Sequence, residues 1–172
     1  MTVLDSSVSV YRFFEEISQV PRGSFHEEKI SDYLEEFAKE RNLQYHRDEM
    51  NNVIIYKEAS SSYEDHEPLM LQGHMDMVCE KNKDCEHDFE NDPLDLYIEE
   101  GNLKARGTTL GADDGCGVAI MLALLDDKNA SHPPLECVFT VQEEVGLFGA
   151  AALDEKLLKS TRMIGLDCEN EM

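Results

Sequence analysis

The stretch from Leu71 to Asp76 constrains this chain more than any other. Apolar residues lead into it, and Gly73, His74 and, two positions later, Asp76 follow. Side chains two positions apart on a strand point to the same side, roughly 7 Å apart. His74 and Asp76 can therefore serve one site, in which the imidazole binds a metal and the carboxylate accepts its other N–H. The alternative for this pair alone is a polar strand end without a metal.

Three later segments repeat this pattern, in which an apolar strand ends in carboxylates. They are residues 111–115 with Asp113, residues 138–144 with Glu143 and Glu144, and residues 163–167 with Asp167. From residue 68 onward, predicted strands alternate with helices, which favours an α/β domain with a mixed, mainly parallel sheet flanked by helices. Sites in such sheets gather at the carboxyl ends of strands. We therefore expect these side chains to converge.

Hydrophobic periodicity predicts the remaining elements. Helices are expected at 8–20, 26–41, 118–125 and within 146–159, and strands at 43–48, 52–57, 135–142 and 162–167. A hairpin is expected at 94–99 and 103–106. The long polar stretch 77–93 follows the first candidate residues directly, which is typical of a functional loop. Ser24 and Ser31 are both candidates to cap the second helix.

The candidate residues are a chemically coherent set of ligands. Converging carboxylates stay ionised only beside cations, because like charges raise one another's pKa. One imidazole among carboxylate oxygens suits Zn²⁺, Mn²⁺ or Co²⁺ better than Ca²⁺. An excess of carboxylates indicates two ions with a bridging carboxylate, the arrangement of many aminopeptidases. One of the adjacent Glu143 and Glu144 can then bind metal while the other acts as a general base.

Each of these later motifs also has a simpler interpretation. Glu143 and Glu144 can form an exposed acidic strand end. Asp114 followed by Gly115 can be a turn in which Asp114 caps the next helix. The remaining histidines lie in polar or turn contexts and are expected to be exposed: His26, His46, His66, His87 and His132.

Composition excludes several classes of function. The 172 residues carry a formal net charge of −22, which argues against nucleic acid as a partner. No run of 18 or more apolar residues occurs, so no membrane-spanning helix is expected. The amino terminus does not have the pattern of a secretory signal, and the five cysteines lack C-x-x-C spacing. These features predict a cytoplasmic protein with reduced thiols.

Taken in order, the motifs at 72–76, 110–115, 142–146 and 165–167 resemble the metal-binding motifs of the M20 family metallopeptidases. Within that family the likeness is greatest to the aminoacyl-histidine, or cytosolic non-specific, dipeptidases. Residues 13–28 and 78–82 carry the same likeness. The resemblance implies hydrolysis of an unblocked dipeptide substrate of the Xaa-His type through a metal-activated water. Deacylation of an N-acyl amino acid is an alternative within the same fold.

The resemblance also implies a role for each candidate residue. It implies that His74 and Asp167 bind one Zn²⁺ and that Glu144 binds a second. Asp113 is implied to bridge the two ions. Mn²⁺ and Co²⁺ are alternatives to Zn²⁺. It further implies that Asp76 orients the imidazole and that Glu143 is the general base. These two form the expected catalytic pair. A cis peptide bond is implied between Asp113 and Asp114.

Members of that family are much longer than 172 residues. The resemblance therefore implies that residues 1–172 correspond to the amino-terminal part of the catalytic domain. The lid or dimerisation domain and the carboxyl-terminal catalytic segment have no counterpart, and no histidine follows His132 to supply the second metal. We do not expect the family's homodimer without that lid. A catalytically inactive metal-binding fragment is accordingly a second hypothesis.

Overall fold

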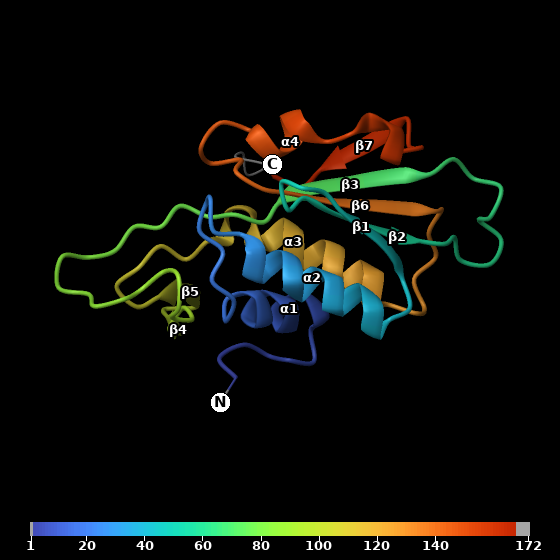
Figure 1. The fold of residues 1–172 in the computed structure, drawn as a ribbon. Coiled ribbons are helices and arrows are strands. Elements are labelled where there is room, and N and C mark those ends of the chain that lie inside the picture. The colour runs from blue at the N-terminus through green and yellow to red at the C-terminus, as the bar shows by residue number, and fades with distance from the viewer. Residues whose placement is uncertain (1, 168–172) are drawn as a thin grey trace.

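The computed structural model describes residues 2–167, and a five-stranded sheet runs through its centre (Figure 1). The strands lie in the order β1 (Gln44–Arg47), β2 (Val53–Lys57), β6 (Leu135–Thr140), β3 (Leu69–His74) and β7 (Arg162–Gly165). β2 pairs antiparallel with both β1 and β6, whereas β3 pairs parallel with both β6 and β7. The predicted mixed sheet is confirmed, with parallel pairing confined to the half that carries His74.

Three helices lie on one side of this sheet (Figure 1). They are α1 (Ser9–Ile17), α2 (Glu28–Glu40) and α3 (Ala112–Asp126). α2 contacts β1 and β2, α3 contacts β3, and α1 packs against α3. α3 is apolar all round, because it lies between α1 and the sheet and buries residues toward both.

The smaller elements complete the predicted pattern. They are the hairpin β4 (Leu96–Glu99) and β5 (Asn102–Ala105), the short helix α4 (Phe148–Ala152) and the 3₁₀ turn η1 (Glu155–Leu157). Every predicted helix and strand has a counterpart. Within residues 2–167, no helix is both long enough and apolar enough to cross a membrane.

The sheet topology brings the predicted site residues to one edge. In the parallel pairing, His74 at the end of β3 lies opposite Thr140 at the end of β6, and Gln72 lies opposite Gly165 of β7. The segments that follow these three strands therefore emerge side by side. All six residues of β6 are buried, so the central strand holds this edge rigidly.

Two details of the sequence prediction are wrong. Neither Ser24 nor Ser31 caps α2: the hydroxyl of Ser31 donates to the carbonyl of Asn51, and that of Ser24 donates to Asp76. Of the histidines expected to be exposed, His46 and His87 are half-buried and His132 is buried, the last because the chain folds back and its backbone N–H donates to the hydroxyl of Ser60.

Asn52 fixes the turn that follows β6. Its buried side chain donates from Nδ2 to the carbonyl of Gly149 (2.9 Å) and to Asp48 (2.7 Å). Its Oδ1 accepts the backbone N–H of Val141 (3.0 Å). One side chain thus joins the loop before β2, the end of β6 and helix α4.

Replacing Asn52 with alanine would leave buried backbone groups without partners. We expect Asn52→Ala to lower the free energy of unfolding by about 2–4 kcal/mol, measured by urea denaturation. Asn129→Ala, at an exposed loop position, is the matched control and should change it by less than about 0.5 kcal/mol. Equal effects of the two substitutions would contradict this role for Asn52.

Candidate metal centre

The imidazole of His74 is almost completely buried, with 1 % of its side chain exposed, and each ring nitrogen faces different groups. Nδ1 lies 3.1 Å from the backbone oxygen of Asp76 and 3.4 Å from its Oδ1. Nε2 lies 2.9 Å from Oδ1 of Asp113. With the proton on Nδ1 donated toward Asp76, Nε2 is available as a metal ligand.

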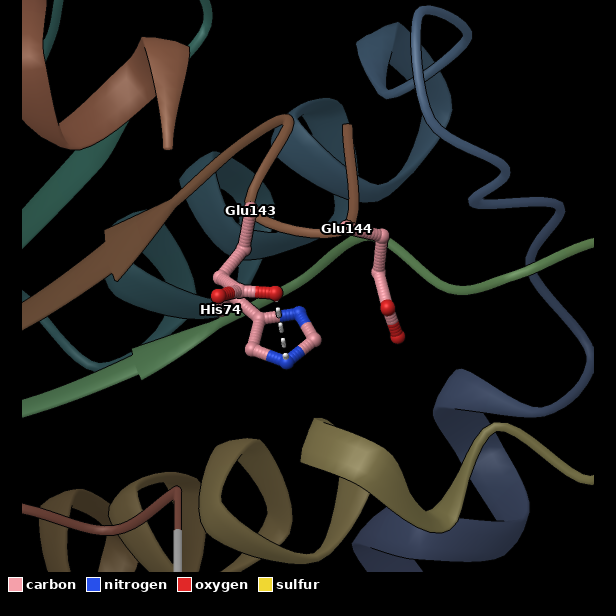
Figure 2. A group of neighbouring side chains, drawn as sticks. All are labelled: His74, Glu143 and Glu144. Carbon is pink, nitrogen blue, oxygen red and sulfur yellow. Dashed lines mark ion pairs between the residues drawn. The ribbon is translucent and has the colours of Figure 1, made fainter. Parts of the chain in front are cut away.

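The remaining predicted ligands surround the same ring nitrogen. Oε2 of Glu143 and Oδ2 of Asp167 each lie 3.9 Å from Nε2 of His74. In Figure 2, the side chains of Glu143 and Glu144 extend from one turn toward the imidazole at the end of β3. Two groups, His74 with Glu143 and Glu144 and His74 with Asp113 and Asp167, each have their ligand atoms within 4.8 Å of one another. The structure thus brings all the sequence-predicted residues together.

The carboxylate of Asp76 is inaccessible to solvent and accepts three hydrogen bonds from two other segments. The donors are the hydroxyl of Ser24 (2.7 Å) and the backbone N–H groups of Glu143 (3.0 Å) and Glu144 (3.3 Å). Burial raises the pKa of Asp76, but its hydrogen bonds with His74, Ser24 and Glu143 lower it more, so the net shift is downward. Asp76 therefore remains an ionised acceptor beside His74.

The positions of Glu143 and Glu144 correct one expectation. β6 ends at Thr140, so both glutamates lie in a turn beyond the strand rather than at its end. They do not point in opposite directions as strand neighbours would, because both backbone N–H groups donate to the carboxylate of Asp76. Both side chains can consequently reach His74.

The side chains of Asp113 and Asp114 have different partners. Asp113 faces His74, whereas Oδ1 of Asp114 accepts the backbone N–H of Gly117 (3.0 Å) at the kink in the first turn of α3. Burial raises the pKa of Asp114 to about 6. The peptide bond between the two aspartates is cis, as the resemblance implied.

Arg22 was not singled out in the sequence as a site residue. Arg22 is 2 % exposed, and its guanidinium donates to the backbone oxygens of Met75 (3.1 Å), Asp76 (3.3 Å) and Gly111. Burial lowers its pKa to about 10, so the side chain is charged at neutral pH. Arg22 links the backbone beside His74 to the loop that carries Asp113.

The donor set fits a divalent cation of the zinc type. Burial lowers the pKa of His74, but the carboxylates of Asp76 and Asp113 raise it more, to about 9. Burial and the charge of Asp113 raise the pKa of Glu144. Both shifts reflect an excess of negative charge around one imidazole, and a mixed nitrogen and oxygen donor set is typical of Zn²⁺, Mn²⁺ and Co²⁺ sites.

An imidazole and several carboxylates at the carboxyl edge of parallel strands are an arrangement typical of metal-dependent hydrolases. Residues 70–170, more than half of the chain, match the protein family described as Peptidase family M20/M25/M40. The chain belongs to this peptidase family.

Two relatives show how far the similarity extends. The chain is 43 % identical over 162 residues to the cytosol non-specific dipeptidase of Escherichia coli (strain K12). The matching region covers 94 % of this chain and 33 % of that protein. The crystal structure of aminoacylhistidine dipeptidase from Vibrio alginolyticus superposes with a TM-score of 0.94 at 38 % identity, over 99 % of this chain and 35 % of that one. The chain thus spans about a third of the length of these relatives.

The fold extends to more distant structures. A tripeptidase from Staphylococcus aureus superposes with a TM-score of 0.79 at 23 % identity, over 98 % of this chain and 45 % of that one. At that identity the likeness concerns the fold alone.

The pKa of His74 leads to a prediction about metal affinity. Without metal, the ring stays protonated up to a pH of about 9, so a cation that binds Nε2 must displace a proton. Apparent Co²⁺ affinity should rise about tenfold per pH unit between pH 6.5 and 8, followed by the absorption of the bound ion. His74→Gln should abolish strong binding, whereas His46→Gln should not. An affinity independent of pH over this range would contradict the assignment.

The three donors on Asp76 lead to a second prediction. An amide at this position cannot accept from all of them, so Asp76→Asn should release the turn of Glu143 and Glu144 and weaken the hold on His74. We expect Zn²⁺ affinity to fall by about 10–100-fold in calorimetric titration. Asp84→Asn, in the exposed loop after β3, is the control. Unchanged affinity in Asp76→Asn would show that Asp76 does not orient the ligands.

Proposed function

We propose that residues 1–172 form the amino-terminal part of the catalytic domain of a metal-dependent dipeptidase. The observation that carries this proposal is the set of carboxylates around Nε2 of His74, in a chain 43 % identical to the Escherichia coli cytosol non-specific dipeptidase. Such an enzyme would act in the cytoplasm, consistent with the name of that relative.

In this proposal the ligands divide between two cations. His74, Asp113 and Asp167, whose ligand atoms lie within 4.8 Å of one another, hold the first. Asp113 and Glu144 would hold the second. Zn²⁺ is the proposed ion, with Mn²⁺ and Co²⁺ as substitutes that the same donor set accepts. When bound, these cations supply Lewis acidity that polarises the peptide carbonyl and lowers the pKa of the attacking water.

The protein's own groups move the protons. Glu143 accepts a proton from the water as its oxygen bonds to the carbonyl carbon, and it gives that proton to the amine as the C–N bond breaks. Asp76 stays ionised and keeps the imidazole of His74 in one orientation. The bonds of Asp76 to the backbone of Glu143 and Glu144 hold the base and a metal ligand in fixed positions.

The proposed substrate is an unblocked dipeptide of the Xaa-His type. The two relatives, a non-specific dipeptidase and an aminoacylhistidine dipeptidase, support this choice over an N-acyl amino acid. We further propose that a lid and the remaining ligand of the second cation come from the part of such proteins that has no counterpart in these 172 residues. Turnover then requires that part, whereas binding of the first cation does not.

A chimaera tests this proposal directly. In it, the present chain replaces the matching third of the Escherichia coli dipeptidase, and dipeptide hydrolysis is measured with Zn²⁺ or Mn²⁺. We expect turnover, and we expect Glu143→Gln to lower kcat by about 10²–10⁴-fold at unchanged metal content.

Glu86→Gln, at an exposed loop position, is the matched control and should leave kcat unchanged. A folded, metal-loaded chimaera without activity would contradict the dipeptidase proposal. Full activity in Glu143→Gln would contradict the role of Glu143 as the base.

A further inference from the structure

A cavity of about 430 Å³ adjoins the metal centre and shares Glu144 with it. Its walls come from the turn before α2, from the segment that continues β3, and from the turn after β6. Phe25, Met77, Val78, Phe89 and Val145 give it a largely apolar lining. Apart from Glu144, no residue of its lining is a proposed metal ligand, so its apolar walls need another explanation. We refer to it as the Phe25 pocket.

Phe25 lines this pocket with an unfavourable backbone conformation. Its φ of +69° lies in the left-handed region, which disfavours a bulky side chain. The ring nevertheless remains 58 % exposed, so burial in the core does not offset the unfavourable backbone. The backbone N–H of Phe25 donates to Oε1 of Glu27 (3.0 Å), which fixes this conformation. Strained residues of this kind cluster where a ligand binds.

The walls of the pocket are tied to the metal centre. Ser24, next to Phe25, donates to the carboxylate of Asp76, which also holds the backbone of Glu144. On the opposite wall, the carbonyl of Val78 accepts the hydroxyl of Thr109 (2.6 Å). The pocket therefore keeps a fixed position relative to the ligands, as a substrate subsite requires.

The charges around the pocket determine which end of a dipeptide it suits. Glu80, Glu90 and Glu144 line it, and among the residues that the structure describes His26 is the one basic side chain in the lining. Nε2 of His26 lies 3.9 Å from Oε1 of Glu90, so the negative charge of Glu90 opposes any positive charge on this histidine. A free ammonium group is attracted to such a surface, whereas a terminal carboxylate is repelled.

We propose that the Phe25 pocket binds the amino-terminal residue of the dipeptide and prefers an apolar or aromatic side chain there. This inference rests on the proposed function, because it takes a dipeptide at the metal centre as given. The apolar walls bury the side chain, Glu80 and Glu90 receive the ammonium group, and the shared Glu144 places the next peptide bond beside the cations.

The test uses Zn²⁺-loaded chain carrying Glu143→Gln, so that the peptides persist. Binding of Phe-Gly, Gly-Phe and Gly-Gly is followed by amide chemical shifts in ¹H–¹⁵N spectra. Phe-Gly should bind about tenfold more tightly than either other peptide and should shift the amides of Phe25, Val78 and Val145. Equal binding of Phe-Gly and Gly-Phe, a preference for Gly-Phe, or no binding by any peptide would overturn the inference.

Two further substitutions separate binding from folding. Phe25→Gly suits the left-handed backbone, so thermal stability should be kept or increased while the preference for Phe-Gly disappears. Val78→Lys places a cation at the pocket and should weaken Phe-Gly binding about tenfold or more, whereas Ile98→Lys, on the distant hairpin, should not. An undiminished preference in both pocket variants would overturn the inference.

Failure of this inference is distinguishable from failure of the proposed function. If the chain still binds Zn²⁺ through His74 and the chimaera is active, but Phe-Gly is not preferred, the role of the Phe25 pocket is wrong. The dipeptidase proposal then still holds. If the chain does not bind Zn²⁺, or if the metal-loaded chimaera is inactive, the dipeptidase proposal itself is contradicted.

Discussion

The buried carboxylate of Asp76 is the interaction on which the rest of the site depends. An ionised group without solvent contact is costly unless donors surround it, and here they come from three parts of the chain. The imidazole of His74 belongs to its own strand, the hydroxyl of Ser24 to the turn before α2, and the N–H groups of Glu143 and Glu144 to the turn after β6. Neutralising this one charge therefore favours the close approach of all three segments, and the metal ligands with them.

Much of the fold could be predicted from the sequence, because most elements bury one face. α1 and α2 have apolar residues at helical spacing, and β3 and β6 are short apolar runs that end in polar residues. α3 was expected to begin at residue 118 but begins at Ala112, and local pattern did not show this because non-helical backbone at Asp113 and Asp114 interrupts its first turn. The order of the strands in the sheet could not be predicted from local sequence patterns either, because strands far apart in the sequence, such as β2 and β6, pair with each other.

The candidate ligands could be predicted because each follows a strand, where parallel pairing brings distant residues together. What could not be predicted were the side chains that act through backbone groups. Arg22 and Asn52 bind carbonyls and N–H groups of other segments, and no spacing in the sequence indicates such partners. Glu143 and Glu144 were expected directly at a strand end rather than in the turn beyond it for a related reason: Asp76, which accepts their backbone N–H groups, lies 67 residues from Glu143.

The central claim is that His74, Asp113 and Asp167 hold a divalent cation. The most direct measurement is a crystal structure of the Zn²⁺-loaded chain with anomalous diffraction at the zinc absorption edge. The account predicts a peak bonded to Nε2 of His74 and to oxygens of Asp113 and Asp167, with Nδ1 still facing Asp76. A peak at other residues, or none while Nε2 of His74 keeps its contact with Asp113, would contradict it.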